Sequence, residues 1–300
     1  MLIEILHRRQ ITLEEFFALS PDDWQKEFAL TATEVVKMNE AKTELPNYAF
    51  LAEELLAQGF QIIPINAPEY SPVLKKNLQI KHAPPLLYVK GNIKQLHEPT
   101  VAVVGSREAS ERAMQFADAI AKKCAAEFRV VSGFAKGVDK QALDSSLKYG
   151  GHSIIVLPQG IMTFGSGIKK YYPQIVAGDI LVLSTFFPKA GWDAGLAMAR
   201  NVYIYGLAEE IYVAESNETG GTWMGVMDGL KKGRTIYVRQ PESDEKNANQ
   251  LLIAKGAIAV DAEGNVLLQE ATMQRQNNAP EATTAGAGQK PKEQMTLFEC

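Results

Sequence analysis

A glycine, a serine and an arginine follow a short hydrophobic run near residue 100. The stretch VAVVGSREAS (residues 101–110) begins with four apolar residues and breaks into Gly105, Ser106 and Arg107. After a buried strand, a glycine lets backbone amides approach an anion, a serine donates a hydroxyl and an arginine grips phosphate oxygens. Ser110 can cap the helix that follows. The residues predict a phosphate-binding turn, although a tight turn with an exposed arginine fits this short motif as well.

A second turn of the same kind follows thirty residues later. In VVSGFAKGVDKQAL (residues 130–143), Ser132, Gly133 and Gly137 surround Lys136, so small residues and backbone amides again accompany a cation. Asp139 is expected to cap or brace the following helix, because no histidine that could share acid–base chemistry lies near it in sequence. Two such turns side by side predict a phosphate track.

Three segments of different composition surround these motifs. Residues 1–60 have the apolar spacing of short helices, including a Thr12–Glu15 capping-box pattern, and predict a small helical module. Residues 61–269 alternate β-branched runs with helical windows, which predicts an α/β fold with a doubly wound, mostly parallel sheet. Residues 270–300 contain few large apolar side chains and predict a disordered tail. The expected strands are residues 60–65, 100–105, 129–133, 153–158, 179–184, 209–215, 234–239 and 257–261.

Composition excludes several classes of protein. The 300 residues are 46% hydrophobic, with a net charge of −4 and two cysteines, Cys124 and Cys300. A disulfide framework or a cysteine-based zinc site is not expected from so few thiols, and the four histidines lack metal-ligand spacing. No signal peptide, membrane span or G-x-S-x-G nucleophile motif is present. A cytoplasmic protein without a metal, a cofactor or a catalytic centre is expected.

Several stretches together resemble one protein family. VAVVGSREAS, VVSGFAKGVDKQAL, GGHSIIVLPQGI and ARNVYIYGLAEEIYVAES follow, in order and spacing, motifs of the DNA-processing protein A family (DprA, also called Smf). The resemblance extends over about residues 55–260 and implies a Rossmann-like fold. It also implies a non-enzymatic protein that binds single-stranded DNA, forms a homodimer, protects strands in DNA uptake and recombination, and helps to load a RecA-type recombinase.

The resemblance also assigns a DNA-binding surface. Arg107 and Lys136 correspond to the family's phosphate-binding cations, and the other positions supply close backbone approach or polar contacts. The predicted DNA- and phosphate-binding residues are Gly105, Ser106, Arg107, Ser132, Gly133, Lys136, Gly137, Gly160, Arg200, Asn201, Gly220, Gly221 and Thr222.

The chain departs from the family pattern at three places. Arg200 and Asn201 match the start of an Arg-Asn-Arg stretch whose second arginine is replaced by Val202, and Thr185 stands where the family has a glutamate. These differences bear on the strength and mode of DNA contact. Trp223, in a turn where the family has small residues, is read either as a base-stacking side chain or as part of the core.

The distribution of charge favours local binding of an anion. Residues 100–240 contain sixteen Lys and Arg and thirteen Asp and Glu, which leaves +3 there and −7 on the rest of the chain. Such a balance suits a protein that grips a few phosphates through shaped loops.

The last residues form a separate motif. Gln294, Met295, Leu297 and Phe298 match the Q-x-x-L-F peptide by which bacterial replication and repair proteins bind the DNA sliding clamp. A tether rich in small and polar residues precedes them, as docking of a peptide requires. Chance occurrence of a five-residue pattern, or folding of Leu297 and Phe298 back onto the chain, remains the alternative.

A different class of function shares this fold. The chain also resembles the LOG phosphoribohydrolases, which cleave nucleoside monophosphates with a P-G-G-x-G-T-x-x-E signature. TGGTWMGVMD (residues 219–228) keeps the paired glycines but lacks the Gly-Thr pair and the following glutamate. Because glycoside-type cleavage needs a nearby carboxylate, hydrolysis is disfavoured. A nucleotide-binding sensor remains the second hypothesis.

Overall fold

The computed structural model describes residues 2–267, and the helices begin at the amino terminus. Four helices come first, namely α1 (Leu2–Arg9), α2 (Leu13–Ala18), α3 (Pro21–Phe28) and α4 (Ala32–Ala57). The expected capping box is confirmed, since Thr12 Oγ1 accepts from the backbone N–H of Glu15 while the Glu15 carboxylate accepts from the Thr12 N–H. Phe16 and Trp24 are buried in a local cluster of these helices. None of the helices within residues 2–267 is long and apolar enough to cross a membrane.

A nine-stranded sheet forms the centre of the remaining fold. Its strands are β1 (Gln61–Pro64), β2 (Leu86–Lys90), β3 (Thr100–Gly105), β4 (Arg129–Ser132), β5 (His152–Val156), β6 (Ile180–Ser184), β7 (Glu210–Glu215), β8 (Ile236–Arg239) and β9 (Ile258–Val260). The spatial order is β1-β2-β6-β5-β4-β3-β7-β8-β9, and only the pairs β1–β2 and β2–β6 are antiparallel. The prediction of an α/β fold with a mostly parallel sheet is confirmed.

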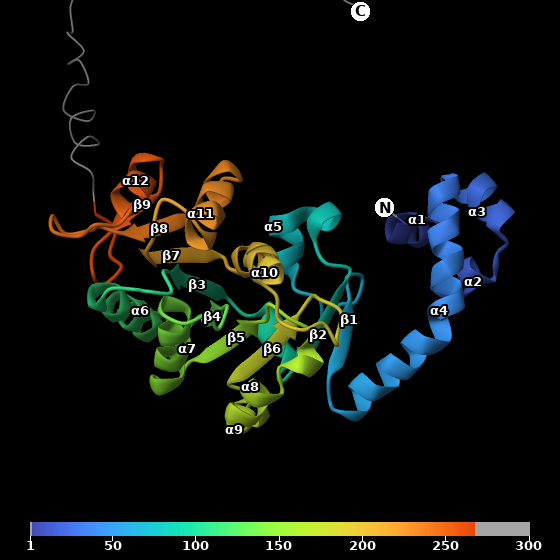
Figure 1. The fold of residues 1–300 in the computed structure, drawn as a ribbon, viewed down its shortest axis with the longest axis horizontal. Helices are drawn as coiled ribbons and strands as arrows, with labels where there is room; N and C mark the ends of the chain where they lie inside the picture. Colours follow the sequence, from blue (N-terminus) through green and yellow to red (C-terminus); the bar gives the residue numbers. More distant parts are fainter. Residues whose placement is uncertain (1, 268–300) are drawn as a thin grey trace, which may run out of the picture. The chain divides into compact units, whose positions relative to one another are not determined.

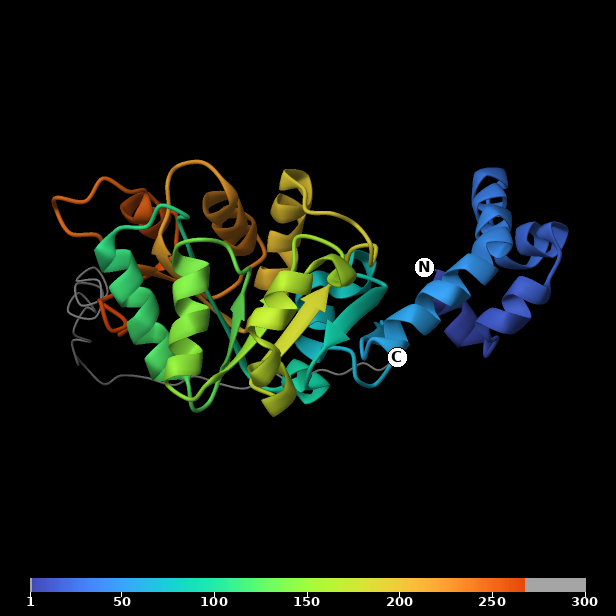
Figure 2. The same cartoon turned by 60° about the horizontal axis from the view of Figure 1, so that its bottom comes forward.

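Helices cover both faces of this sheet, as Figures 1 and 2 show. One face carries α5 (Pro72–His82), α10 (Ala194–Leu207), α11 (Gly221–Lys231) and α12 (Asn249–Ala254), and the other carries α6 (Glu111–Cys124), α7 (Val138–Lys148), α8 (Gly165–Lys170) and α9 (Tyr172–Ala177). Two short 3-10 helices, η1 (Ile93–His97) and η2 (Ile161–Thr163), lie in the connections. In β3, Val101 and Val103 pack on one face while Ala102 and Val104 pack on the other. Side chains that alternate along β3 thus pack against the helices on both faces of the sheet.

The order of the strands reverses at β3. From β3 the chain runs outward through β4, β5 and β6, and α10 then returns it to β7 on the other side of β3. In open α/β sheets, ligands bind in the crevice outside the carboxyl ends of the strands at such a reversal. The loops that follow β3, β4 and β7 are therefore the places to look for a site.

One strand was not expected from the sequence. The eight expected strands are all present, but β2 was missed. It is a five-residue run that follows Pro84 and Pro85, and it pairs antiparallel with β6. Its two partners are β1 and β6, and the second lies more than ninety residues away, so the local pattern does not reveal its place inside the sheet.

Candidate functional site

The two predicted phosphate-binding turns lie against each other. β3 and β4 are neighbouring parallel strands, so the loops after them leave the sheet at the same edge. The backbone N–H of Val138 donates to the carbonyl of Ser106 over 3.3 Å. Gly137 has a φ of +86°, and a side-chain carbon there would come within 2.3 Å of that carbonyl oxygen. Glycine at position 137 thus permits the contact between the turns.

A cavity of about 460 Å³ opens where the strand order reverses. The loop after β3 contributes Gly105, Ser106 and Arg107 to its wall, and α10 contributes Arg200 and Asn201. The opposite wall is the start of α11, where Gly220, Gly221 and Thr222 line the cavity. No side chain caps this helix start, so its first N–H groups are available to an anion.

A second cavity of about 350 Å³ adjoins the first. Gly133 and Lys136 from the loop after β4 line it, together with Trp192 from the loop after β6. Arg107 and Arg200 line both cavities. The two cavities therefore share a boundary at these two arginines and Ala135.

Arg200 forms a buried floor between the cavities. Its side chain is only 2% exposed, and Nη1 donates to the Val156 carbonyl over 3.2 Å. A Cβ at Gly133 would come within 1.5 Å of Nη1, so only glycine leaves room for the guanidinium. Within residues 2–267, the Nε atom has no hydrogen-bond partner. Arg200 thus retains donor capacity although it is buried.

Asp139 braces the second turn from beneath. Its carboxylate accepts from the Gly133 N–H over 3.1 Å, and its backbone carbonyl accepts from Ser132 Oγ over 2.7 Å. Burial raises the pKa of Asp139, and the nearby Arg200 opposes that shift. Burial lowers the pKa of Arg200, opposed in turn by Asp139. Asp139 was expected to cap or brace the following helix; it lies within the first turn of α7, caps no helix N–H group of the described residues, and instead contacts Ser132 and Gly133 of the preceding turn.

The exposed cations are Arg107 and Lys136. Both side chains are open to solvent. Within the described part of the chain, neither forms an ion pair with a carboxylate. Both line the second cavity together with the buried Arg200, so positive charge is concentrated there.

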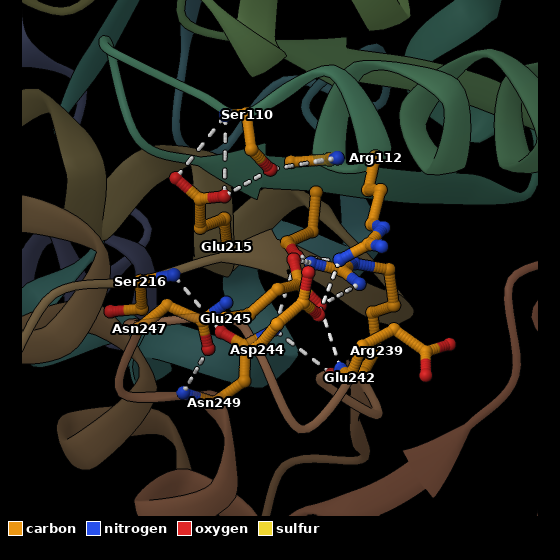
Figure 3. A network of polar contacts seen from close by, with 12 residues as sticks. Ser110, Arg112, Glu215, Ser216, Arg239, Glu242, Asp244, Glu245, Asn247 and Asn249 are labelled. Carbon is orange, nitrogen blue, oxygen red and sulfur yellow. Dashed lines mark hydrogen bonds and ion pairs between the residues drawn. The ribbon is translucent and has the colours of Figure 1, made fainter.

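Sequence reasoning missed the side chain that holds the Arg107 turn. Glu215, 8% exposed at the end of β7, accepts from the Ser110 N–H over 3.2 Å and from the Ser110 hydroxyl (Figure 3). Its carbonyl also accepts from the Ser106 N–H over 2.9 Å. Ser110 caps α6 as expected, because its Oγ accepts from the Ala113 N–H. The sequence shows only an acid at the end of an expected strand, because the contact joins residues 105 positions apart.

An ion pair fixes the loop between β8 and α12 near the start of α6. The guanidinium of Arg239 donates to both carboxylate oxygens of Glu245 over 2.9 and 2.6 Å, and Nε donates to the Ala214 carbonyl (Figure 3). The side chains are 5% and 8% exposed. On the same loop, Asp244 accepts from Arg112 of α6 over 2.8 Å. This network joins the loop to the helix that the Arg107 turn begins.

Some predicted site residues lie away from the cavity walls. Ser132 is buried and serves as a donor to Asp139. Gly160 lines neither cavity, and a Cβ there would come within 2.3 Å of the carbonyl oxygens of Phe187 and Pro188. Trp223 is partly buried against the main core cluster. The predicted clamp-binding residues Gln294, Met295, Leu297 and Phe298 lie outside the described residues.

The described residues contain no cluster of the kind that holds a metal. Within residues 2–267, no group of three or more His, Cys, Asp and Glu side chains lies together in such an arrangement. The first cavity is lined by side chains of both signs, since Glu108 and Asp139 stand there with Arg107 and Arg200.

Comparisons with known proteins agree on one family. The family model described as DNA recombination-mediator protein A matches residues 61–271. The DNA processing protein DprA of Streptococcus pneumoniae is 33% identical over 159 residues, which span 53% of this chain and 56% of that protein. Protein Smf of Synechocystis is 25% identical over 93% of this chain and 78% of its own length.

Two solved structures share the fold. The X-ray structure of DprA from Streptococcus pneumoniae superimposes with a TM-score of 0.64 at 27% identity, covering 81% of this chain and 89% of that one. DNA processing protein A from Helicobacter pylori, described for its single-stranded DNA binding mode, superimposes with a TM-score of 0.56 at 23% identity over 67% and 90% of the two chains.

Proposed function

The chain belongs to the DNA recombination-mediator protein A family, and we propose that it binds single-stranded DNA at the two adjoining cavities and acts in recombination without catalysis. The observation that carries the proposal is the shared boundary. Arg107 and Arg200 line both cavities, and Lys136 stands at the second. Successive phosphates of one strand can therefore meet cations on a continuous path.

The geometry favours a single strand over a duplex. Arg200 lies at the floor, where it is 2% exposed, and a strand must bend into the hollow to approach it. A flexible single strand can place a phosphate or sugar there, whereas a duplex presents its phosphates on a stiff, wide cylinder. Arg107 and Lys136 remain reachable by either form. We therefore expect the surface charge to attract both forms of DNA, and only the single strand to contact Arg200.

A binding role suits the acidic groups better than hydrolysis does. Asp139, the buried acid beside the cavities, is already occupied by the N–H of Gly133. Glu215 is occupied by Ser110. The turn at Gly220 and Gly221 is followed by Thr222 and Trp223, without the glutamate that a phosphoribohydrolase of the LOG type requires. These features support a protein that holds its ligand unchanged.

Three protein partners belong to the same proposal. By its family, the chain is proposed to form a homodimer and to help to load a RecA-type recombinase onto the strand it protects. Residues 294–298 are proposed to tether it to the DNA sliding clamp, because Gln294, Leu297 and Phe298 stand at the spacing of a clamp-binding peptide. Their tests are the mass of the chain in solution, recombinase loading on coated strands, and binding of the isolated clamp.

A nucleotide is the second candidate ligand. The first cavity, of about 460 Å³, is large enough for a mononucleotide and is closed by the uncapped start of α11. A sensor of free nucleotides would use this cavity alone, whereas a DNA strand would use both. Competition between a nucleoside monophosphate and an oligonucleotide distinguishes the two.

The decisive experiment is a titration of a labelled oligonucleotide, followed by fluorescence anisotropy at several salt concentrations. Three phosphate contacts predict that log K falls with log salt at a slope of about −2, since each contact on a single strand contributes roughly −0.7. Replacing Arg107→Ala and Lys136→Ala together should lower the affinity roughly 30-fold, if each contact contributes about 1 kcal/mol, and should reduce the slope to about −0.7.

The matched control removes the same charge elsewhere. Lys231→Ala with Lys255→Ala takes away two exposed cations at the carboxyl ends of α11 and α12, away from the loops that follow β3, β4 and β7. This variant should bind as the wild type does. A duplex of equal length should bind more weakly to all three proteins. Equal losses in the two double variants would refute a defined site and leave only a general effect of net charge.

A further inference from the structure

One indole ring lies exposed beside the cations of the second cavity. Trp192 lines that cavity together with Arg107, Lys136 and Arg200. It is 59% exposed, although tryptophan is usually well buried. A flat apolar side chain therefore borders the proposed phosphate-binding surface.

The backbone around Trp192 is held on both sides. Before it, the carbonyl of Ala190 accepts from the Gly160 N–H over 2.9 Å and from Thr163 Oγ1 over 2.9 Å. After it, Asp193 caps α10 by accepting from the N–H groups of Gly195 and Leu196 over 2.7 and 3.1 Å. Because the chain is bonded two residues before Trp192 and one residue after it, the backbone that carries the indole is held in place and little of it has to order on binding.

Gly160 allows the loop that carries Trp192 to pack closely against the turn that follows β5. The carbonyl oxygens of Phe187 and Pro188 lie where a side chain at position 160 would stand, 2.3 Å from a Cβ. The N–H of Met162 donates to the Pro188 carbonyl over 3.0 Å. These contacts make Gly160 the point at which the loop that carries Trp192 packs, whether or not Gly160 also contacts DNA as predicted.

We propose that Trp192 stacks against one nucleobase of the bound single strand while Arg107 and Lys136 bind the adjoining phosphates. The proposal rests on the proposed function and specifies which part of the strand the second cavity receives. Aromatic side chains stack on any base, since every base has a flat face, so this contact would be independent of sequence. Bases within a duplex are already stacked and paired, so the same contact would select for single strands.

The first test compares affinities of full-length variants. Trp192→Ala should weaken binding of a single-stranded oligonucleotide by roughly 5- to 150-fold, the range for loss of one stacked base, and Trp192→Phe should retain most of the affinity. Phe50→Ala is the matched control, because Phe50 of α4 is also an exposed aromatic residue, 71% exposed, and lines neither cavity, so its loss should leave binding unchanged. Circular dichroism checks that each variant is folded.

The second test removes the base from the DNA. An oligonucleotide of abasic sites keeps the phosphates and lacks the stacking partner. The wild type and Trp192→Ala should bind it with equal affinity, whereas a role of Trp192 in holding the phosphate-binding loops would still separate them.

The third test observes the indole directly. Tryptophan emission should be quenched when an ordinary oligonucleotide binds, and the quenching should disappear in Trp192→Phe, which leaves Trp24 and Trp223 in place. Trp24 is fully buried and Trp223 is packed against the core, so both should respond little.

The outcomes separate this inference from the proposed function. If the wild type binds single strands and Trp192→Ala binds them equally well, stacking is refuted and the phosphate track stands. If a loss persists on abasic DNA, Trp192 acts through the loop and the stacking proposal is again wrong. If the folded wild type binds no single strand, both proposals fail.

Discussion

The buried ion pair between Arg239 and Glu245 gives the sharpest prediction about stability. Arg239→Met removes the cation and leaves the Glu245 carboxylate 8% exposed, while the Ala214 carbonyl loses one of its two donors and keeps Asn249 Nδ2. Leaving one partner of a buried pair uncompensated costs about 3–5 kcal/mol. For a chain of this size, each kcal/mol lowers Tm by roughly 2–4 °C, so we expect a loss of roughly 6–20 °C.

A second substitution should restore much of that loss. In the double variant Arg239→Met with Glu245→Gln, no charge is buried, and the amide oxygen can still accept from the Glu242 N–H, which donates to Glu245 over 2.7 Å. We expect the double variant to lie within about 2 kcal/mol of the wild type, so the two substitutions are strongly non-additive. Urea unfolding at pH 7 measures the three free energies.

The pH dependence of the stability loss in Arg239→Met tests the same reasoning independently. Hydrogen bonds from Arg239 hold the pKa of Glu245 below its ordinary value of 4.5. In the wild type, this group's contribution is present above pH 4.5 and is lost as the pH falls through the lowered pKa. In Arg239→Met, the pKa of Glu245 should rise from its wild-type position because the hydrogen bonds from the cation are gone, so the penalty should shrink as the pH falls. A penalty that is below 1 kcal/mol, or that grows on acidification, would refute the reasoning.

Three further predictions concern other parts of the chain. Gly133→Ala should displace the guanidinium of Arg200, because its Nη1 lies 1.5 Å from the added carbon. We expect the free energy of unfolding, measured with urea, to fall by about 1–3 kcal/mol. We also expect the affinity for single-stranded DNA, measured by anisotropy, to fall at least tenfold. Burial raises the pKa of Cys124 to about 11, so this thiol should react with iodoacetamide only after unfolding, and rapid labelling of the native protein, located by mass spectrometry, would contradict its burial. Leu297→Ala with Phe298→Ala should abolish a micromolar interaction with the sliding clamp in a pull-down or calorimetric titration while single-strand affinity stays the same.

Much of the fold could be predicted from local pattern. The helix that begins after Thr12 was predicted from a serine- or threonine-to-glutamate spacing, because a capping box needs only residues three apart. Strands such as Thr100–Gly105 were predicted from unbroken runs of β-branched residues, which are typical of strands covered on both faces. β2 escaped prediction because its pairing with β6 depends on residues far away in the chain.

Some residues of the candidate site could be predicted from the sequence and others could not. Arg107 and Lys136 could be selected from the sequence, since a cation beside glycines after an expected strand has a clear chemical meaning and the strand's end fixes its edge of the sheet. Glu215 and Trp192 could not, because one is an acid at the end of a strand and the other an aromatic residue in a loop, and neither type signals a role without its neighbours.

The sequence by itself determined the alternation of strands and helices, the capped helix starts and the placing of two cations after two strands. These features depend on residues within one or two turns of each other. The tertiary structure alone decided that Arg200 lies buried over Gly133, that Glu215 holds the turn before α6, and that two cavities share their guanidinium groups. Each of these joins residues 67 or more positions apart or from several separate loops, and such contacts are set by the order of the strands, which no local pattern contains.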